Sequence, residues 1–352
     1  MAEKQNLRAG GIPAEVPALL LDWFEQNARD LPWRQDREPY HVWLSEIMLQ
    51  QTRVQAVLGY YVRFLQALPD VASLAACEQD KLLKLWEGLG YYSRVRNLQK
   101  AAQVICAEHG GTFPKEYAAI RALPGIGDYT AGAIASICFE QPKAAVDGNV
   151  LRVVTRLMGD DTPIESIAFR KAVAAALEAV YPAGKCGAFA QALMELGALV
   201  CVPNGAPLCD KCPLAHLCRA KAEGRIEALP VKEKKKPRRK EQLTVLLLWC
   251  EGKLALCRRP DEGLLAGLWQ LPNVSGELST EQALQQAAEW GVQPLHPEQV
   301  IHRKHIFTHV EWEMTGVAIR CSREAEDFIW ADADQRAGEY ALPTAFRQFL
   351  EE

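Results

Sequence analysis

The spacing of hydrophobic residues in the first two thirds of the chain has a helical period. From Val16 to about Ala220, apolar residues recur three and four positions apart, as in Leu20, Trp23 and Phe24, and Gly and Pro fall between such segments. A stripe with this period lies on one face of an α-helix and packs against a core. The pattern therefore predicts an almost wholly helical region.

The last third of the chain has the pattern of short strands. A basic run, Lys232–Lys240, holds seven bases and one acid and separates the two regions. Beyond it, apolar segments are bounded by turn residues such as Glu251-Gly252, which is typical of strands. The predicted strands are Leu243–Trp249, Lys253–Arg258, Thr308–Cys321 and Phe328–Asp332, and the predicted helices are Thr280–Trp290 and Pro343–Leu350. The sequence thus predicts a helical domain, a charged linker and a smaller α+β domain.

Composition and charge exclude several classes of protein. The 352 residues are enough for two or three domains, since a domain takes ~100–200 residues. The net charge of −4 and the pI of about 6.1 argue against a protein that coats DNA by neutralising phosphates. Apolar runs such as Thr244–Cys250 fall far short of the ~18 residues of a membrane helix, and the polar N-terminus, MAEKQNLRAGG, lacks the apolar stretch of a signal peptide. We therefore expect a cytoplasmic protein, nucleoid-associated in a bacterium, whose eleven cysteines are reduced thiols or metal ligands.

Four cysteines are bunched within eighteen residues, in CVPNGAPLCDKCPLAHLC. They are Cys201, Cys209, Cys212 and Cys218. Thiols that merely fill a core would not gather in Pro- and Gly-rich sequence, whereas four thiolates at this spacing can enclose one soft metal centre, either zinc or a 4Fe-4S cluster. The wide first gap fits the cluster better than two zinc knuckles, and we expect His216 to be a bystander.

A glycine-containing turn follows a helical segment that ends at Arg121 and precedes one that restarts near Tyr129. The turn consists of Leu123, Pro124, Gly125, Ile126 and Gly127. Two glycines permit backbone conformations closed to other residues and expose N–H groups to a phosphate, or to a cation that bridges to one. This predicts a helix-hairpin-helix, although the motif alone could be only a tight turn. Asp147, in the DGNV sequence about twenty residues on, favours the first interpretation because it places a carboxylate at the start of the next helix.

A third candidate is Glu46, in WLSEIMLQQTRV. Its neighbours Trp43, Ile47 and Met48 are apolar, and burial of a carboxyl among apolar groups raises its pKa, so that it can donate a proton near neutral pH. The alternative is a surface charge, or an ion pair with Arg53. Cleavage of an N-glycosidic bond needs an acid for the leaving base and an anion near the cationic sugar. Glu46 and Asp147 could supply the two.

Together these motifs resemble the endonuclease III superfamily, and within it the A/G-specific adenine DNA glycosylases of the MutY type. LPWRQDREPYHVWLSEIMLQQTRV, WEGLGYYSRVRNL, LPGIGDYTAGAI, VDGNVLRV and the four cysteines occur in the family's order over nearly the whole chain. Bifunctional lyases of the superfamily carry a Schiff-base lysine two residues after the last glycine of the hairpin, where this chain has Tyr129. The resemblance therefore implies a monofunctional glycosylase.

The resemblance also implies domain boundaries and a fold. We expect an all-α helix-hairpin-helix glycosylase domain over residues 1–230, in which 31–135 form the six-helix part and 1–30 with 136–230 form the part that bears the iron-sulfur loop. A basic linker over 231–241 and an α+β Nudix-like domain over 242–352 follow. Seven residues, Val202–Leu208, separate the first two cysteines where the family usually has six, and an extra loop residue can be absorbed without moving the ligands.

The family match implies roles for individual residues. Glu46 would protonate the flipped adenine, Asp147 would stabilise or trap the oxocarbenium-like sugar, and Tyr129 and Asn149 would hydrogen-bond at that centre. The other residues that the resemblance places at the substrate are Trp33, Arg34 and Gln191 in the adenine pocket, and Gln51, Thr52, Leu89 and Tyr91 beside the lesion. Extrusion of a base from the stack costs a few kcal/mol, which such inserted residues offset.

The C-terminal region resembles a Nudix domain without its metal site. A Nudix hydrolase binds metal through a helix reading REUxEExGU, and the nearest match, Leu284–Val292, keeps only Glu289 of the metal-site glutamates. One carboxylate gives Mg²⁺ too few oxygen ligands. The family interpretation is recognition of 8-oxoguanine through Phe307, Thr308 and His309, which stand where these enzymes carry FSH.

We therefore expect a monomeric enzyme that binds duplex DNA containing A:8-oxoguanine or A:G mispairs and releases the adenine, with one 4Fe-4S cluster and a cation at the hairpin. Two other classes compete. A bifunctional glycosylase/lyase is disfavoured by Tyr129, and a non-enzymatic iron-sulfur DNA-binding protein is disfavoured by the retention of both Glu46 and Asp147.

Overall fold

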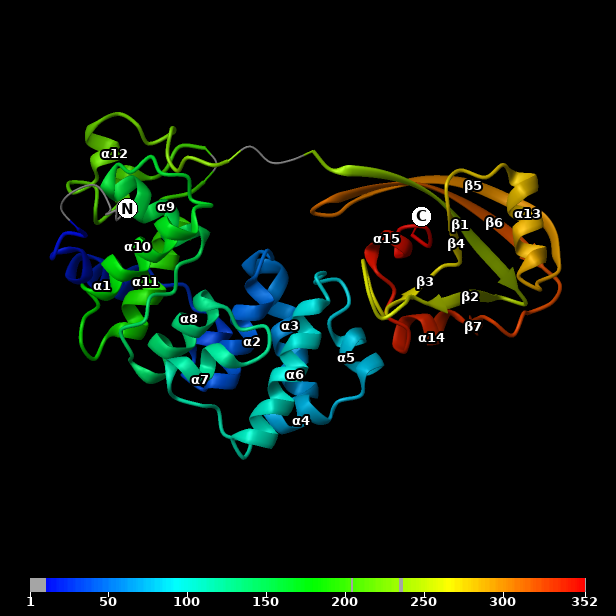
Figure 1. Ribbon diagram of the computed structural model, residues 1–352, viewed down its shortest axis with the longest axis horizontal. Helices are drawn as coiled ribbons and strands as arrows, with labels where there is room; N and C mark the ends of the chain where they lie inside the picture. Colours follow the sequence, from blue (N-terminus) through cyan, green and yellow to red (C-terminus); the bar gives the residue numbers. More distant parts are fainter. Residues whose placement is uncertain (1–10, 204, 234–236, 352) are drawn as a thin grey trace, which may run out of the picture. The chain divides into compact units, whose positions relative to one another are not determined.

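The computed structural model describes residues 11–203, 205–233 and 237–351. These residues fold into two compact units, shown in Figure 1. The first unit comprises residues 11–76 and 96–233, and the second comprises residues 77–95 and 237–351. The expectations for residues 1–10 and for residues 234–236 of the basic linker lie outside the described residues.

The first unit is helical, as the apolar spacing predicts. Its helices are α1 (Val16–Asn27), η1 (Pro32–Arg34), α2 (Pro39–Leu49), α3 (Val54–Ala67), α4 (Val71–Ala76), α6 (Ser93–Glu108, which begins at the unit boundary), α7 (Tyr117–Ala122), α8 (Asp128–Phe139), α9 (Gly148–Met158), α10 (Ile167–Glu178), α11 (Cys186–Leu199), η2 (Cys209–Lys211) and α12 (Arg219–Ala222).

Helix α11 is the centre of this unit. It packs against α8 and α9 and against α1 from the other end of the sequence, and Figure 1 shows α1 beside the green helices α9 to α11. The approach of α11 to α8 is close at Gly187, where an added Cβ would lie 2.8 Å from the Cα of Ile137. Such a contact is below van der Waals distance, so the packing of these two helices depends on a residue without a side chain.

The turn between α7 and α8 has the hairpin geometry in part. Gly125 has a φ of +74°, and an added Cβ would lie 2.5 Å from the Cβ of Asn97, so this position favours glycine twice over. Gly127 differs from the expectation. As the N-cap of α8 it has a φ of −90°, which any residue adopts, and a Cβ there would meet nothing within 4 Å. The backbone at position 127 therefore does not require glycine, and the missing side chain leaves open space at the start of α8.

The second unit contains a mixed sheet. Its elements are α5 (Gln79–Leu85), β1 (Arg239–Cys250), β2 (Lys253–Arg258), β3 (Trp269–Gln270), β4 (Asn273–Ser275), α13 (Thr280–Glu289), β5 (Pro294–Ile306), β6 (Val310–Cys321), β7 (Ile329–Ala331), α14 (Ala333–Gly338) and α15 (Thr344–Arg347). The strand order is β3-β2-β1-β6-β5, with β4 paired to β1 and β7 to β2. Strands β1 and β6 are parallel, with Val245 opposite Gly316, and the other pairs are antiparallel.

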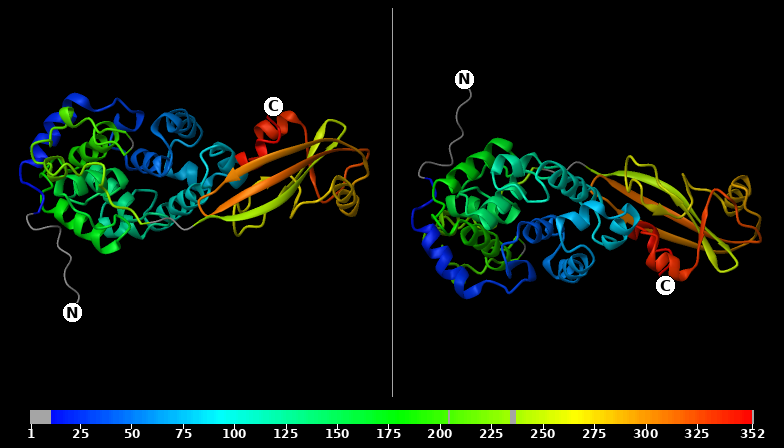
Figure 2. Two further views of the ribbon diagram at one scale, coloured as in Figure 1. Left: turned by 90° about the horizontal axis from the view of Figure 1, so that it is seen from above. Right: turned by 90° about the horizontal axis from the view of Figure 1, so that it is seen from below.

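Alternating residues of β1 serve two separate cores. Val245 and Leu247 pack with Phe346 of α15 on one face, whereas Leu246 and Leu248 pack with α13 on the other. Figure 2 shows α13 (gold) and α15 (red) on opposite sides of the sheet. A strand that is covered on both faces reads as a continuous apolar run, which is why LTVLLLW carries little polar alternation.

The sequence did not predict strands β3, β4 and β5 or helix α14, and two predicted boundaries also differ. Strand β5 was not predicted, because its sequence, PLHPEQVIHRKHI, holds two prolines and few apolar residues, and it lies at the sheet edge with most side chains exposed. Strand β1 begins at Arg239, inside the expected linker, because residues 239–241 pair with β6. Thr308 and His309 lie in the turn before β6, not in a strand, and the turn is closed by the Phe307 N–H donating to the Val310 carbonyl at 2.8 Å.

Candidate active site

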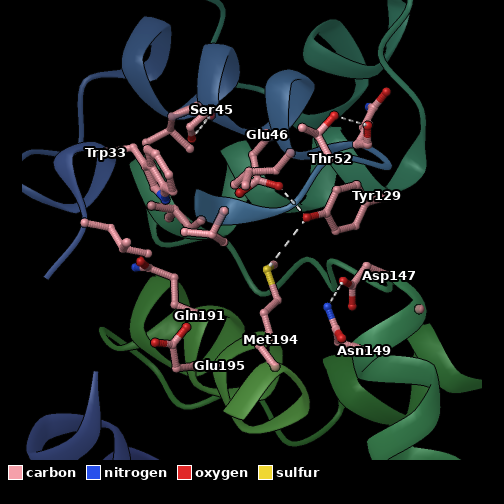
Figure 3. A pocket seen from close by; sticks show the side chains of 18 of the residues that line it. Trp33, Ser45, Glu46, Thr52, Tyr129, Asp147, Asn149, Gln191, Met194 and Glu195 are labelled. Carbon is pink, nitrogen blue, oxygen red and sulfur yellow. Dashed lines mark hydrogen bonds between the residues drawn. The ribbon is translucent and has the colours of Figure 1, made fainter. Parts of the chain in front are cut away.

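One large cavity of about 580 Å³ opens in the first unit between α2, α8, α11 and the start of α9. Figure 3 shows that side chains from these elements converge on it. Its lining includes most of the residues that the sequence singles out for chemistry, adenine binding or contact with the lesion: Trp33, Arg34, Glu46, Gln51, Thr52, Tyr129, Asp147, Asn149 and Gln191. The fold thus brings together side chains from opposite ends of the unit's sequence.

Glu46 lies on the inward side of α2 and is 6% exposed, as its apolar neighbours predict. The hydroxyl of Tyr129, on α8, donates a hydrogen bond to Glu46 Oε2. Burial raises the pKa of Glu46 to about 7; the Tyr129 hydrogen bond opposes this rise, and the nearby charge of Asp147 adds to it. Glu46 is therefore poised between its acid and its anionic form near neutral pH.

Asp147 approaches the same cavity from the N-terminus of α9, which it caps. Its Oδ1 accepts the Val150 N–H at 2.7 Å, and its Oδ2 accepts the Asn149 amide at 2.7 Å. Burial raises the pKa of Asp147, while these hydrogen bonds and the charge of Arg152 favour its anion. The positive end of the α9 dipole acts in the same direction.

The two carboxyl groups have unlike surroundings in one cavity. Asp147 receives backbone and side-chain hydrogen bonds at a helix N-terminus, whereas Glu46 accepts a hydrogen bond from the Tyr129 hydroxyl among apolar neighbours. Surroundings of this kind separate the roles of two carboxyls, so that one holds a proton and the other a charge. The arrangement suits a reaction that protonates a leaving group beside a developing cation.

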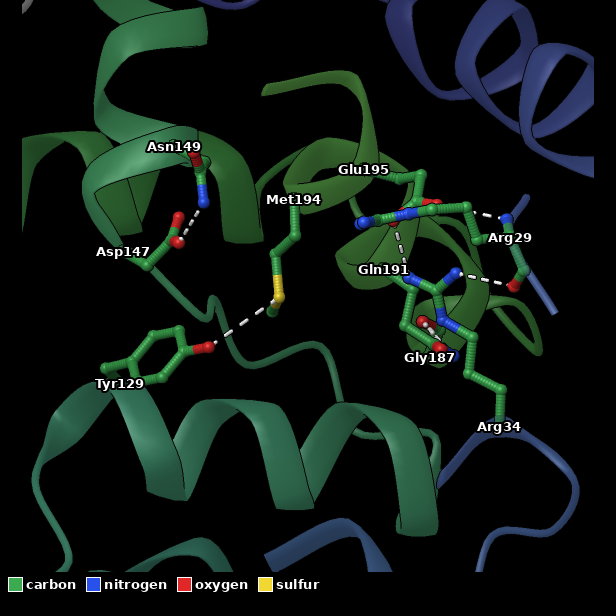
Figure 4. Close-up of polar contacts among 9 residues, drawn as sticks. All are labelled: Arg29, Arg34, Tyr129, Asp147, Asn149, Gly187, Gln191, Met194 and Glu195. Atoms are coloured by element: carbon green, nitrogen blue, oxygen red, sulfur yellow. Dashed lines mark hydrogen bonds and ion pairs between the residues drawn. The ribbon is translucent and has the colours of Figure 1, made fainter. Parts of the chain in front are cut away.

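Sequence reasoning missed a third carboxylate in the cavity wall. Glu195 on α11 is 1% exposed and holds two guanidinium groups, as Figure 4 shows: Arg29 donates to both of its oxygens at 2.7 and 2.8 Å, and Arg34 donates to Oε2 at 2.8 Å. Burial alone would raise the pKa of Glu195, but these hydrogen bonds outweigh it and lower the pKa to about 2. The signal was present, since Glu195 is a lone charge in the apolar sequence of α11.

A chain of hydrogen bonds joins the cavity to the cysteine loop. Arg152 donates to Asn149 Oδ1 at 2.8 Å and to the carbonyl of Cys201 at 2.7 Å. It also donates to the carbonyl of Gly197 at 2.7 Å, where an added Cβ would lie 2.6 Å from the Cβ of Asn149. The position of Asn149, and through it that of Asp147, therefore depends on the loop that follows α11.

The four clustered cysteines line one small cavity of about 30 Å³: Cys201, Cys209, Cys212 and Cys218. The Arg156 guanidinium donates to Cys201 Sγ at 3.3 Å. Within the described ranges, no three His, Cys, Asp or Glu side chains are placed so as to hold a metal ion directly. The thiols nevertheless face a common space beside a cationic donor, which suits an anionic thiolate-ligated group.

Of the residues that the resemblance assigns to the lesion, Gln51 and Thr52 line the cavity of the first unit, and the others lie in the second unit. Thr308 and His309 are exposed at the tip of the β5–β6 hairpin, while Phe307 is half-buried with its ring 4.8 Å from that of Trp312. The Tyr91 hydroxyl lies 3.1 Å from Thr308 Oγ1, although the two are far apart in sequence. Leu89 is buried.

Two family models match the chain. The HhH-GPD superfamily of base excision DNA repair proteins matches residues 44–178, and the NUDIX domain matches residues 244–352. The adenine DNA glycosylase of Rattus norvegicus is 35% identical over 94% of this chain and 77% of its own length. That of Buchnera aphidicola (strain APS) is 33% identical over 95% of this chain and 96% of its own length.

The chain belongs to the adenine DNA glycosylase family. Among solved structures, a thermostable thymine-DNA glycosylase is 30% identical and matches with a TM-score of 0.54, covering 59% of this chain and 95% of that one. This adenine DNA glycosylase hydrolyses the N-glycosidic bond of adenine in base excision repair. The predicted order of a helix-hairpin-helix domain and a Nudix domain is confirmed.

The Nudix part of this glycosylase keeps one glutamate of the hydrolase motif. Glu289 ends α13, where Gln285 donates to its Oε1 at 3.1 Å and Gln286 lies within 3.5 Å of its Oε2. The other two glutamates of the motif correspond to Gln285 and Ala288, so neither position supplies a second carboxylate.

Among the residues that the structure describes, no helix combines the length and apolar character needed to cross a bilayer.

Proposed function

We propose that this glycosylase removes adenine paired with 8-oxoguanine, or with guanine, by monofunctional hydrolysis in which Glu46 is the general acid and Asp147 stabilises or traps the sugar cation. The observation that carries the proposal is the pairing, in one cavity, of a carboxyl with a pKa of about 7 and a carboxylate that caps the N-terminus of a helix. Catalytic acids work best with a pKa near the operating pH.

The proposed reaction balances with water as the only co-reactant. Glu46 gives its proton to the five-membered ring of the extruded adenine, and the bond to the sugar breaks with its electron pair going to the base. Asp147 faces the resulting cation. Water then adds its hydroxide to the sugar, and its proton restores the acid form of Glu46. Tyr129 stands where a lyase has lysine, and a phenol forms no Schiff base, so the strand stays intact.

Asn149 and Tyr129 orient the two carboxyl groups, through the hydrogen bonds to Asp147 and Glu46. Trp33, Arg34 and Gln191 line the cavity and are proposed to bind the base. The ion pair with Glu195 fixes the Arg34 guanidinium, so that part of the pocket is set before a base enters.

We assign contacts with the lesion to Gln51, Thr52, Leu89, Tyr91, Phe307, Thr308 and His309, as the sequence resemblance implies. Gln51 and Tyr91 have positive φ values of 58° and 46°, which are uncommon for residues other than glycine. Backbone held in this region is concentrated at functional sites, in keeping with side chains that enter the stack when adenine leaves. Thr52 and Leu89 flank these two residues. Thr308 and His309, with Phe307 as their anchor in the core, are proposed to read 8-oxoguanine.

The cysteine loop is proposed to hold one 4Fe-4S cluster through Cys201, Cys209, Cys212 and Cys218. The sequence resemblance implies such a cluster, and the common cavity of the four thiols and the Arg156 contact support it here. When bound, the cluster would supply a rigid cross-link of the loop. We expect about four irons per chain and a brown protein; stoichiometric zinc without iron would contradict this. Cys212→Ser should lower the yield of folded protein more than the specific activity of what folds.

The turn from Leu123 to Gly127 is proposed to bind the DNA backbone. The open space at Gly127, at the start of α8, lets a phosphate approach N–H groups directly or through a cation. The enzyme is proposed to act as a monomer.

A strand-nicking assay on an A:8-oxoguanine duplex tests the proposal. Incubation should give nicks only after hot alkali, because the product is an abasic site in an intact strand. Glu46→Gln should bind this duplex nearly as well as wild type and lose ~10²–10⁴-fold in excision. Nicking without alkali would show a lyase, and near-normal excision by Glu46→Gln and Asp147→Asn would refute the two carboxyl roles.

A further inference from the structure

Lys84, near the end of α5, is joined to α14 and to the stretch that follows it. Its ammonium group donates to the carbonyl of Arg336 at 2.9 Å and to that of Tyr340 at 3.1 Å. It also forms an ion pair with Glu87 Oε2 at 2.7 Å. The side chain is 17% exposed, so all three contacts are shielded from solvent. Each contact is a charge-assisted hydrogen bond, which is stronger than a neutral one.

Glu87, which has the opposite charge to Lys84, contacts the same segment. Its Oε2 pairs with Lys84, and its Oε1 accepts the backbone N–H of Leu342 at 2.7 Å. The side chain is 15% exposed. Two adjacent charges thus engage three backbone groups of one short segment, residues 336–342. We call Lys84 and Glu87 the latch.

The residues between the latch and Tyr91 form a closed turn. The Trp86 indole donates to the Gly90 carbonyl at 3.0 Å, and Arg94 donates to the carbonyls of Leu89 and Gly90 at 2.9 and 3.1 Å. The Arg94 guanidinium also lies over the rings of Trp86 and Tyr91, at 5.3 and 5.6 Å from their centroids. A displacement at Glu87 is therefore passed on to Tyr91 through a turn with little freedom of its own.

We propose that Lys84 and Glu87 are positioning residues for lesion discrimination: the latch fixes the Gln79–Tyr91 segment so that the Tyr91 hydroxyl meets Thr308 at the tip of the β5–β6 hairpin. The inference rests on the proposed function, in which Tyr91 and Thr308 face the lesion. The inference extends the proposed function by identifying the residues that hold Tyr91 close to Thr308. Since Glu46 and Asp147 lie elsewhere, the latch acts on the preference between 8-oxoguanine and guanine and leaves the chemical step unchanged.

The test measures binding preference in the full-length protein carrying Glu46→Gln, which binds without excision. The dissociation constants for A:8-oxoguanine and A:G duplexes at one salt concentration give a preference ratio for this parent. Lys84→Met should lower the ratio about two- to tenfold, the range that corresponds to one lost hydrogen bond. The matched control is Lys81→Met, an exposed lysine on the same helix, which should keep the parent ratio.

A double-mutant cycle separates positioning from a general loss of stability. Tyr91→Phe removes the hydroxyl that meets Thr308, so it should lower the ratio in the parent and have little further effect in the Lys84→Met background. With Glu46 restored, single-turnover excision from A:G at saturating Lys84→Met protein should match wild type. If Lys84→Met folds poorly, Glu87→Gln keeps an oxygen for the Leu342 N–H and removes the charge, and should give the same pattern.

An unchanged ratio in Lys84→Met, beside a ratio lowered by Thr308→Ala, would overturn the latch while leaving the proposed function intact. Additive effects of Lys84→Met and Tyr91→Phe would also overturn it. A parent ratio near one would instead refute the proposed lesion reading, and with it the role of the latch. The parent and its variants therefore distinguish the two failures.

Discussion

The pH dependence of excision should follow the proton on Glu46. Because the pKa of this buried carboxyl is about 7, the single-turnover rate should be flat at acidic pH and fall about tenfold per pH unit above pH 7. The rate at pH 8 should be about a tenth of the plateau. With the ordinary pKa of 4.5, the same acid would already be almost wholly ionised at pH 7.

Tyr129→Phe should move this profile in a direction that the geometry fixes. The Tyr129 hydroxyl donates to the Glu46 carboxylate and so favours its charged form, which lowers the pKa. A hydrogen bond to a charged group contributes about 1.5 kcal/mol, and 1.36 kcal/mol corresponds to a tenfold change, so the midpoint should rise by about one pH unit. Ser45→Ala is the control, since the Ser45 hydroxyl donates to the Val42 carbonyl, not to Glu46.

The assay is single-turnover excision of adenine between pH 5.5 and 9, read as alkali-dependent strand cleavage. A profile without an alkaline fall would refute the assignment of Glu46 as the acid. A midpoint that stays in place or falls in Tyr129→Phe would refute the electrostatic account of its pKa. A Ser45→Ala midpoint that rises as much would show that the shift reflects general loosening of the pocket.

Three further outcomes concern stability and packing. The raised pKa of Glu46 destabilises the folded state above about pH 7 and has no effect below pH 4.5. Glu46→Gln should therefore raise the free energy of unfolding by about 3 kcal/mol at pH 8 and hardly change it at pH 4. Equal effects at the two pH values would refute this. The lowered pKa of Glu195 stabilises the folded state above pH 4.5, and this stabilisation is lost as the pH falls toward 2. Glu195→Gln should therefore lower the free energy of unfolding by about 3 kcal/mol at pH 7 and only slightly at pH 2, as measured by denaturant unfolding. Gly197→Ala should displace Asn149 and slow excision at least tenfold, whereas Gly338→Ala, where a Cβ meets nothing within 4 Å, should not; equal rates would contradict the packing argument.

The sequence by itself determined the features that depend on neighbours along the chain. Helical periodicity defined the first unit, and the N-cap position of Asp147 was readable because capping is set within three residues. The burial of Glu46 followed from its apolar neighbours on α2. The motif order indicated the family. Strand β5 was not readable, because a largely exposed edge strand carries no apolar alternation and its pairing with β6 supplies the order instead.

Tertiary structure alone decided which of these groups meet. Glu46 and Asp147 share a cavity only because α2 and α9 converge on it, and the raised pKa of Glu46 arises from that convergence. The ion pairs of Glu195 and the junction at Lys84 join segments far apart in the chain, and no local spacing encodes such partners. Local signals specify elements because their interactions are short in sequence; sites are built from long-range contacts, whose partners are set by the packing of the whole unit.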